Sequence, residues 1–161
     1  MSDVLVSVAG ADRIADLAEL WESLGDHHST LDDVPAVRAA ADRWERRQRQ
    51  YREWLADGSG RLFIAERDGR ALGYLMLTIG DGPATWEVGD RVAEIETMAV
   101  LPGERAGGVG TALIEAALAA AEAAGLATIA VGVVHSNAAA IRFYERAGFR
   151  PFYVELLRFQ G

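Results

Sequence analysis

The spacing of apolar residues predicts a chain in which strands and helices follow one another closely. Apolar residues that alternate or run together predict strands, and those that recur every three or four residues predict helices. Strands are predicted at 4–8, 62–65, 72–79, 92–101, 128–134 and 152–159. Helices are predicted at 13–24, 35–57 and 137–147, and a long Ala-rich helix is predicted to follow a glycine-rich turn and to end near Ala124. The order β-α-α-β-β-β-α-β-α-β predicts an α/β protein, with one mixed sheet covered by helices on both faces. Residues 1–161 show no linker and no repeat, so we expect a single domain.

Short polar segments predict where the elements are connected. Asp68-Gly69 lies between two apolar runs and predicts a tight hairpin turn. Segment 26–33, DHHSTLDD, has no periodicity and predicts a loop. Pro35 suits the first turn of the helix that follows it, and segment 58–60, Gly-Ser-Gly, suits the end of that helix.

The composition excludes several classes of enzyme. All 16 positively charged side chains are Arg, so the chain contains no Lys, and it contains no Cys. Without Lys there is no Schiff-base chemistry and no lysine-dependent phosphate loop. Without Cys there is no thiolate nucleophile, no zinc finger and no disulfide, and we expect no metal site.

The net charge of −8 argues against a nucleic-acid partner and slightly favours a cationic one. The arginines of helix 35–57 are interleaved with acidic residues, so we interpret this helix as a solvated outer surface and not as a nucleic-acid-binding helix. These arginines are Arg38, Arg43, Arg46, Arg47, Arg49 and Arg52. No apolar run reaches the length of a membrane span, and Asp3 interrupts any signal-peptide pattern. We therefore expect a cytoplasmic protein with no membrane partner.

The clearest chemical feature is the glycine-rich turn 105–111, RAGGVGT, between a predicted strand and a predicted helix. Backbone N–H groups at a helix N-terminus bind phosphate, glycine lets an anion approach closely, and Arg105 adds a positive charge. The turn is therefore either a phosphate cradle or only a tight connection. A nucleotide phosphate loop would need Lys where Val109 stands, and a dinucleotide fingerprint would need a third glycine where Leu113 stands.

A third pattern, [RQ]-x-x-G-x-[GA], is matched by Arg105, Gly108 and Gly110. It resembles the acetyl-coenzyme A pyrophosphate loop of the GNAT superfamily of N-acetyltransferases. Segment 93–102, AEIETMAVLP, is similar to the family's strand before that loop, and segment 137–149, NAAAIRFYERAGF, is similar to its block N-x-x-A-x-x-F-Y-x-x-x-G-F. The resemblance covers residues 61–161 and implies the GNAT fold, whereas residues 1–60 match only in the order of their elements.

The resemblance also implies how acetyl-coenzyme A would bind. Backbone N–H groups would hold the pyrophosphate, those of Gly108, Val109, Gly110 and Thr111 directly and those of Arg105, Ala106 and Gly107 nearby. The segment Met98-Ala99-Val100 would pair with the coenzyme arm like an added strand, chiefly through the main chains of Met98 and Val100. The Met98 N–H group is the expected oxyanion donor, and Asn137 would hydrogen-bond the same arm. Tyr144 matches the family's tyrosine near the sulfur and is the candidate general acid; alternatively it is a core aromatic that packs beside Ile141.

Two carboxylates are candidates for the base. Glu94 and Glu96 alternate with Ile95 and Thr97, so both are expected on one face of a strand. Glu96, two residues before Met98, stands where the family often places a base. Direct proton transfer from an alkylammonium to a carboxylate is unfavourable, so a relay through water is expected. The alternative is that Glu94 or Glu96 binds the positively charged amine.

These residues predict an N-acetyltransferase that moves an acetyl group from acetyl-coenzyme A to a primary amine of a small molecule or peptide. Because no cysteine is present to carry the acyl group, we expect direct attack in a ternary complex. One alternative is a non-catalytic coenzyme A-binding module with the same fold. A more distant alternative is a dinucleotide-dependent oxidoreductase.

By analogy with the family, helix 13–24, loop 26–33 and the connection around Trp86 are expected to line the acceptor side. His27, His28 and His135 are candidates for proton transfer or acceptor binding, although histidines in loops are more often simply solvated. The acidic residues Asp26, Asp32 and Asp33 would suit a cationic acceptor. Dimers are common in the family, and the predicted final strand, with Phe152, Val154, Leu156 and Phe159, is a candidate contact for a homodimer.

Overall fold

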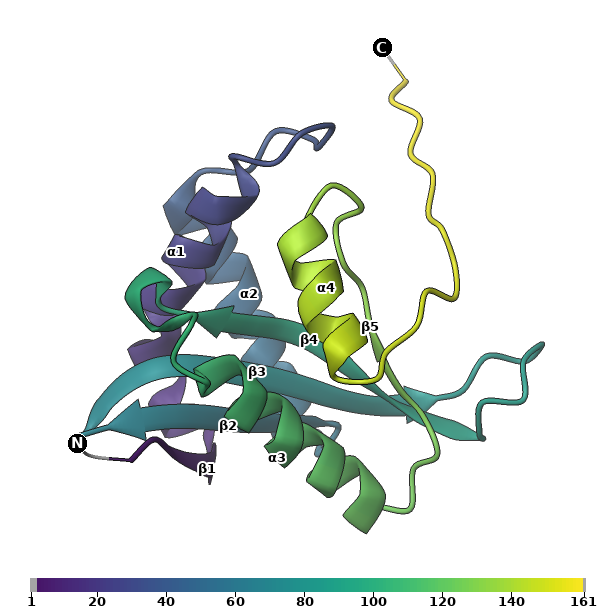
Figure 1. The fold of residues 1–161 in the computed structure, drawn as a ribbon, viewed down its shortest axis with the longest axis horizontal. Coiled ribbons are helices and arrows are strands. Elements are labelled where there is room, and N and C mark those ends of the chain that lie inside the picture. The colour runs from purple at the N-terminus through teal and green to yellow at the C-terminus, as the bar shows by residue number, and fades with distance from the viewer. Residues whose placement is uncertain (1–2, 161) are drawn as a thin grey trace.

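The computed structural model describes residues 3–160, and within them one mixed sheet has the strand order β1-β2-β3-β4-β5 (Figure 1). The strands are β1 (Leu5–Ala9), β2 (Gly60–Arg67), β3 (Arg70–Asp81), β4 (Arg91–Val100) and β5 (Ile129–Val131). Neighbouring strands are antiparallel, except that β5 runs parallel to β4. The mixed α/β sheet expected from the sequence is therefore confirmed.

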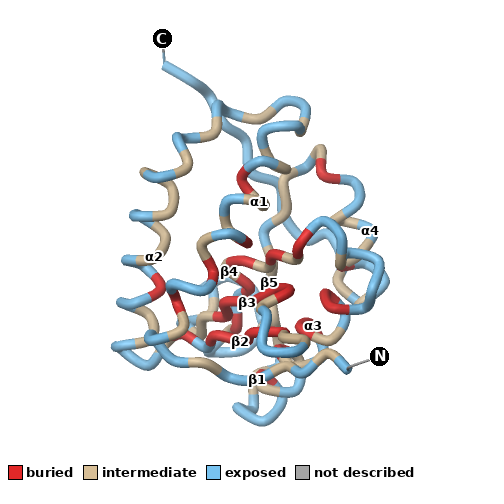
Figure 2. Tube along the Cα trace, turned by 90° about the vertical axis from the view of Figure 1, so that its left-hand side faces the viewer, coloured by how far each residue is buried: buried red, intermediate tan, exposed pale blue. Residues whose placement is uncertain are grey.

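Helices cover both faces of this sheet. The α-helices are α1 (Ala18–His28), α2 (Ala40–Ala56), α3 (Val109–Ala123) and α4 (Ala138–Arg146), and short 3₁₀ helices span Ala11–Leu17 and Pro102–Glu104. Figures 1 and 2 together show α1 and α2 on one face of the sheet and α3 and α4 on the other. No helix of the described chain is both long enough and apolar enough to cross a bilayer.

The core lies between the central strands and the helices on either side. Leu62, Ile64, Leu75 and Leu77 are fully buried, and Figure 2 shows the buried trace concentrated in the sheet. Close packing of α3 depends on Gly73 of β3, because a Cβ there would lie 2.9 Å from the Ala99 carbonyl oxygen and 3.0 Å from Val109 Cγ1. The N-terminus of α3 therefore lies directly against β3 and β4.

The turn between β2 and β3 has the predicted geometry. Asp68 (φ 52°) and Gly69 (φ 77°) both adopt positive φ, as the tight turn that suits the twist of a hairpin requires.

Two irregularities of β4 shape its central part. Met76 of β3 pairs with Thr97 and Leu77 pairs with Ile95, so Glu96 is an extra residue without an opposite partner. Such a β-bulge re-aims the side chains beside it. On its other side, β4 pairs with β5 only at Ala93–Ile95, opposite Ile129–Val131. Beyond Ile95, within the described residues, that edge of β4 has no strand beside it.

The ends of several elements differ from the predictions. Helix α1 continues to His28, so the first part of segment 26–33 is helical and not loop. Helix α2 begins at Ala40 instead of Pro35, with an Ala39 N-cap that makes no side-chain capping bond. Segment 35–39 contains no Ser, Thr, Asp or Asn that would favour an earlier start. Strand β5 is shorter than the predicted 128–134 because β4 and β5 separate there.

The predicted final strand at 152–159 is wrong. In Figure 1 this segment leaves the body of the protein as an extended coil, and its apolar residues are exposed, with Leu156 at 89%. Its β-branched and aromatic residues favour a strand only where a pleated surface is available for pairing. The short β5 does not pair with this segment, so the local preference is not expressed.

Candidate functional site

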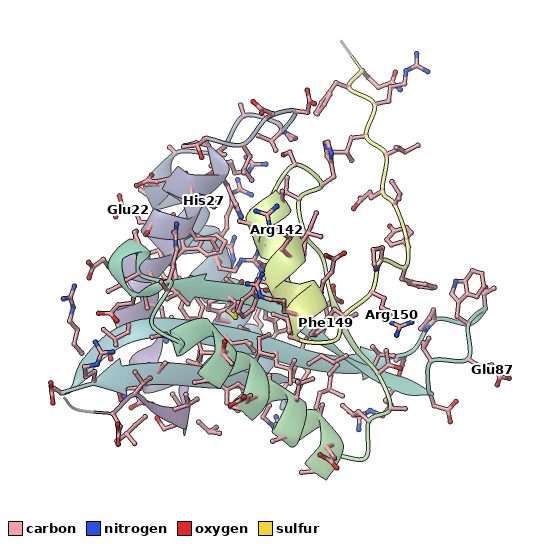
Figure 3. The ribbon with its side chains drawn as sticks, viewed as in Figure 1. Glu22, His27, Glu87, Arg142, Phe149 and Arg150 are labelled. Carbon is pink, nitrogen blue, oxygen red and sulfur yellow. The ribbon has the colours of Figure 1, made fainter. Side chains whose placement is uncertain are left out.

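A cavity of about 410 Å³ opens where β4 and β5 separate. Its walls come from α1 and α2 on one side, α4 on the other, residues 95–100 of β4, residues 131–134, and Arg105 and Gly110 at the start of α3. Figure 3 shows His27 at the end of α1 and Arg142 on α4, the two helices between which the cavity opens. A site at separated strands is typical of ligand sites in α/β proteins.

The free edge of β4 presents main-chain groups to this cavity. The Leu101 N–H group donates to the Leu72 carbonyl, so it points toward β3. Along an antiparallel strand the direction alternates, and the N–H and C=O groups of Met98 and Val100 therefore point toward the cavity side. Arg105 Nε donates to the Val100 carbonyl at 3.3 Å. An extended ligand can pair with this edge as a further strand would.

The N-terminus of α3 is built to receive an anion. Gly108 is its N-cap with φ 81° and ψ 0°, and no side chain caps the helix. The Ala112 N–H group makes the first bond, to the Gly108 carbonyl, so the preceding N–H groups of residues 109–111 are free for a ligand. The loop before the helix is tied to β2 by a 3.1 Å ion pair between Arg67 and Glu104.

Glu96 and Glu94 lie together on the α2 face of the sheet. Thr78 pairs with Glu94 in register and donates from Oγ1 to Glu96 Oε1 at 2.6 Å. Partial burial of the Glu94 carboxyl group, and then the charge of Glu96, raise the pKa of Glu94, although the residue as a whole is exposed. Of the two carboxylates, only Glu96 lines the cavity, whereas Glu94 is exposed. The bulge thus brings Glu96 to the cavity and leaves Glu94 behind it.

A hydrogen-bonded group of hydroxyls supports β4 from the α2 face of the sheet. The Tyr51 hydroxyl of α2 donates to Thr97 Oγ1 at 2.6 Å and lies 3.1 Å from the Tyr74 hydroxyl. All three side chains are buried. Burial raises the pKa of Tyr51 to about 12, and it raises the pKa of Tyr74 well above its usual value. These hydroxyls remain protonated at neutral pH and hold Thr97, the neighbour of the bulge, in place.

Tyr144 lines the cavity from α4. It is 8% exposed, and burial raises the pKa of its phenol to about 12. Its ring packs edge-on against Phe143 at 5.3 Å and Phe149 at 5.5 Å. The Phe143 ring in turn lies 3.3 Å from the position of a Cβ on Gly110, so α4 contacts the start of α3. Tyr144 is therefore both part of an aromatic cluster and in contact with the cavity.

The chain is similar over most of its length to a known family. Residues 20–149 match the description "Acetyltransferase (GNAT) family". The chain belongs to the GNAT family. Its sheet, its separated strands and the glycine-rich start of α3 are thus those of a GNAT protein.

Relatives and a solved structure agree with the family. An uncharacterised N-acetyltransferase of Mycobacterium tuberculosis is 35% identical over 101 residues, which are 63% of this chain and 60% of that protein. A mycothiol acetyltransferase of Thermobispora bispora is 32% identical over 158 residues, 92% of this chain but 46% of that protein. A Clostridium acetobutylicum protein described as a predicted acetyltransferase, solved with acetyl-CoA, has the same fold, with a TM-score of 0.76, 17% identity and 96% coverage of both chains. The aligned regions thus span less than two thirds of the curated relatives.

The structure brings most of the predicted residues of this GNAT chain to one cavity. The predicted residues that line it are Glu96, Met98, Ala99, Val100, Arg105, Gly110, Asn137 and Tyr144. Ala106, Gly107, Gly108 and Thr111 are exposed in the adjoining turn, and Val109 is buried beneath it. The side chain of Asn137 is engaged locally, because its Oδ1 accepts the Ala140 N–H and caps α4.

Three expectations for the acceptor side need correction. His27 and His28 do line the cavity, but from the last turn of α1 and not from a loop. Trp86 is 57% exposed and packs edge-on against Phe152, with the ring centroids 5.6 Å apart, and Figure 3 shows the adjacent Glu87 at the far tip of the β3–β4 connection. His135 is exposed and lies outside the cavity lining.

Sequence reasoning missed Arg47, whereas Trp21 lies in segment 13–24, which was expected on the acceptor side. Arg47 was assigned to a solvated surface, yet it is half-buried and lies over the Trp21 ring at 4.9 Å. Both residues line the cavity. The signal was present, because Arg47 comes three residues after Trp44 and four before Tyr51, on the inward face of α2. The bulge at Glu96 had no such signal.

Proposed function

We propose that this GNAT chain transfers an acetyl group from acetyl-coenzyme A to a primary amine. The observation that carries the proposal is the combination, in one cavity, of an uncapped helix N-terminus, a free strand edge and one carboxylate. The family membership supports an acyl-coenzyme A donor, and relatives named as acetyltransferases favour acetyl over larger groups.

The chain's own groups fit the donor. The backbone N–H groups of residues 109–111 would bind the pyrophosphate, and Arg105 would add a charge beside it. The Met98 and Val100 main chains would pair with the amide-containing arm and direct the thioester toward Glu96 and Tyr144. Ala99 separates these two residues and points its own main-chain groups to β3. Asn137 already caps α4, so we assign it a positioning role at the cavity wall.

The reaction requires a neutral amine and a polarised carbonyl. The amine nitrogen attacks the thioester carbon, the C–N bond forms and the C–S bond breaks, and the ammonium proton is lost while the thiolate gains one. The Met98 N–H group would stabilise the developing oxyanion. Because the chain has no Cys, no acyl-cysteine can form and the attack is direct.

Glu96 serves the amine. It is the carboxylate in the cavity lining, with Thr78 fixing one of its oxygens at 2.6 Å. Glu94, which is the register partner of the same Thr78, adds negative charge near Glu96. We propose that Glu96 binds the ammonium and passes its proton through water, because a carboxylate is a much weaker base than an alkylamine.

Tyr144 serves the leaving thiolate. With a pKa raised to about 12 by burial, its phenol is protonated at neutral pH and donates a hydrogen bond to the sulfur as negative charge develops. Two protons leave the substrate nitrogen in all. The first passes by way of Glu96 and water to solvent before the attack, and the second, lost after the C–N bond forms, balances the one that the thiolate takes up.

The test is turnover with a panel of primary amines. The chain is incubated with acetyl-coenzyme A and each amine, free thiol is followed over time, and the acetylated product is identified by mass. We expect thiol release that depends on the amine. Donor binding without transfer to any amine would favour the alternative, a non-catalytic coenzyme A-binding module, and no binding at millimolar donor would exclude both.

The quaternary structure remains a proposal of its own. We propose a homodimer in which the apolar residues of segment 152–159 are covered, because they are exposed in the single chain. Light scattering of the full chain and of a chain ending at residue 150 tests it. A monomer at all concentrations for the full chain would contradict it. A single domain over residues 1–161 and a cytoplasmic location also stay predictions.

A further inference from the structure

Arg47 carries a free charge on the acceptor side of the cavity. Its guanidinium lies 4.9 Å from the Trp21 ring centroid and 5.8 Å from that of Tyr51. Such stacking uses the face of the guanidinium plane and leaves its in-plane N–H groups available. Among residues 3–160, Arg47 forms no ion pair with a carboxylate.

A second hollow, of about 440 Å³, adjoins the cavity at this point. Trp21 and Arg47 line both hollows. The second one is otherwise lined by Arg38, just before α2, by arginines of α2 and by Gln50, and we call it the arginine hollow. Its arginines are Arg38, Arg43, Arg46, Arg47 and Arg49. Asp42 pairs with two of them, Arg46 at 2.9 Å and Arg38 at 3.8 Å. The other three have no carboxylate partner in the described chain.

Arg43 strengthens the positive potential of the arginine hollow. Its Nη1 donates to the Arg38 carbonyl at 2.8 Å, but Nε and Nη2 are buried and have no partner among the described residues. The guanidinium packs against Gly25 of α1, where a Cβ would overlap it. Arg43 as a whole is half-buried, but buried donor atoms without a partner are costly, and a nearby anion reduces this cost. Burial, and then the charges of His27 and Arg43, lower the pKa of the adjacent His28.

Opposite charges, Arg47 and Glu96, thus line the same cavity on its acceptor side. Glu96 lies where the amine must react, and Arg47 lies between that point and the arginine hollow. Both act on the same phenol, since the charge of Arg47 lowers and that of Glu96 raises the pKa of Tyr51. A ligand with an ammonium at one end and an anion at the other complements this arrangement.

We propose that the acceptor is an amine that also carries a carboxylate or a phosphate, and that Arg47 binds this anionic group. This inference rests on the proposed function. The net charge of −8 favours a cationic acceptor overall. Charges more than about 8 Å apart are largely screened at physiological salt, however, so the local arginines decide. The acidic residues Asp26, Asp32 and Asp33 lie outside the lining of both hollows.

The test compares amines that differ in the anion alone. Ethanolamine is paired with O-phosphoethanolamine, and propylamine with β-alanine, with 1,3-diaminopropane as the cationic reference; the two pairs distinguish phosphate from carboxylate. For the wild type we expect kcat/KM to be about 10- to 100-fold higher for the anionic member of at least one pair, the range for a charge-assisted hydrogen bond. In Arg47→Gln this ratio falls to about one.

The matched control is Arg52→Gln, because Arg52 is an exposed arginine of the same helix that lines neither hollow. It removes the same charge and should keep the wild-type ratio. Arg47→Lys, which keeps the charge but not the planar fork, guards against a folding defect, and we expect an intermediate ratio. Equal changes in the two Gln variants would overturn the assignment to Arg47, since only net charge would then matter.

Binding without donor separates this inference from the proposed function. Calorimetry with O-phosphoethanolamine or β-alanine alone should give weaker binding to Arg47→Gln than to Arg52→Gln. Transfer to amines with no preference for the anionic partners overturns the inference and leaves the proposed function intact. Anion binding that depends on Arg47, without acetyl transfer to any amine, supports Arg47 as the anion site and refutes the proposed acetyltransferase function. A preference for 1,3-diaminopropane would favour the cationic acceptor instead.

Discussion

Gly108 is required at the start of α3 for its backbone conformation and not for lack of room for a side chain. Its φ of 81° lies in the left-handed region, and a Cβ at this position would meet nothing within 4 Å. Gly108→Ala therefore adds no clash, only the cost of placing an L-residue there, about 1–2 kcal/mol. For a chain of this size, each kcal/mol lowers the melting temperature by about 2–4 °C.

Gly103 supplies the matched control. A Cβ on Gly103 also meets nothing within 4 Å, but its φ is not in the left-handed region. Gly103→Ala should be neutral, or stabilising by about 0.4–1 kcal/mol because the unfolded chain loses freedom. The two variants add the same methyl group to the same loop. The difference in melting temperature between them is then about 2–12 °C, with Gly108→Ala the less stable.

The same pair tests the anion cradle. If Gly108→Ala relieves its strain by changing φ, the N–H groups of residues 109–111 turn away from a common point and acetyl-coenzyme A binds more weakly. Melting curves and calorimetric titration with acetyl-coenzyme A measure both effects. Equal melting temperatures and equal donor affinities in the two variants would show that the left-handed φ of Gly108 matters neither to stability nor to donor binding.

Three further predictions concern the tyrosines, with exposed Tyr153→Phe as the common control. Tyr144→Phe should lower kcat with little change in donor affinity; steady-state kinetics and titration check this, and an unchanged kcat would remove Tyr144 from the acid role. Tyr51→Phe removes the hydroxyl group that contacts Thr97 and Tyr74, so it should lower the free energy of unfolding by about 1–3 kcal/mol in urea melts. A loss of stability no larger than that of Tyr153→Phe would mean that the Tyr51 hydroxyl group contributes nothing. Stability should also fall as the pH rises from about 10 to 12, because the pKa values of Tyr51 and Tyr144 are raised to about 12 and unfolded tyrosine ionises first. Urea midpoints that stay constant across that range would contradict these pKa values.

Local signals in the sequence predicted the local structure well. The Asp68-Gly69 turn was predictable because its two positive φ angles follow from the residues themselves. Segment 137–149 was predictable for a similar reason, since Asn137 caps α4 directly and Gly148 (φ 95°) follows its end. The family resemblance then placed Glu96, Met98 and Tyr144 near one another.

Non-local contacts explain what the sequence did not predict. Segment 152–159 has strand-forming residues, but whether it pairs depends on an edge elsewhere in the chain. The bulge at Glu96 arises from the register with β3, and no residue type near Glu96 marks it. Arg47 and Arg52 are both arginines, and they lie five positions apart on α2. Only the docking of α1 on α2 makes the first half-buried and leaves the second exposed.

The most direct test of the donor site is amide hydrogen exchange with and without acetyl-coenzyme A. We predict slower exchange at the start of α3, residues 109–111, and at Met98 and Val100 on the free edge of β4. The exchange rates of the paired strands β1 and β2, at the opposite edge of the sheet, should not change. Protection confined to other segments, or no change at saturating acetyl-coenzyme A, would contradict the account.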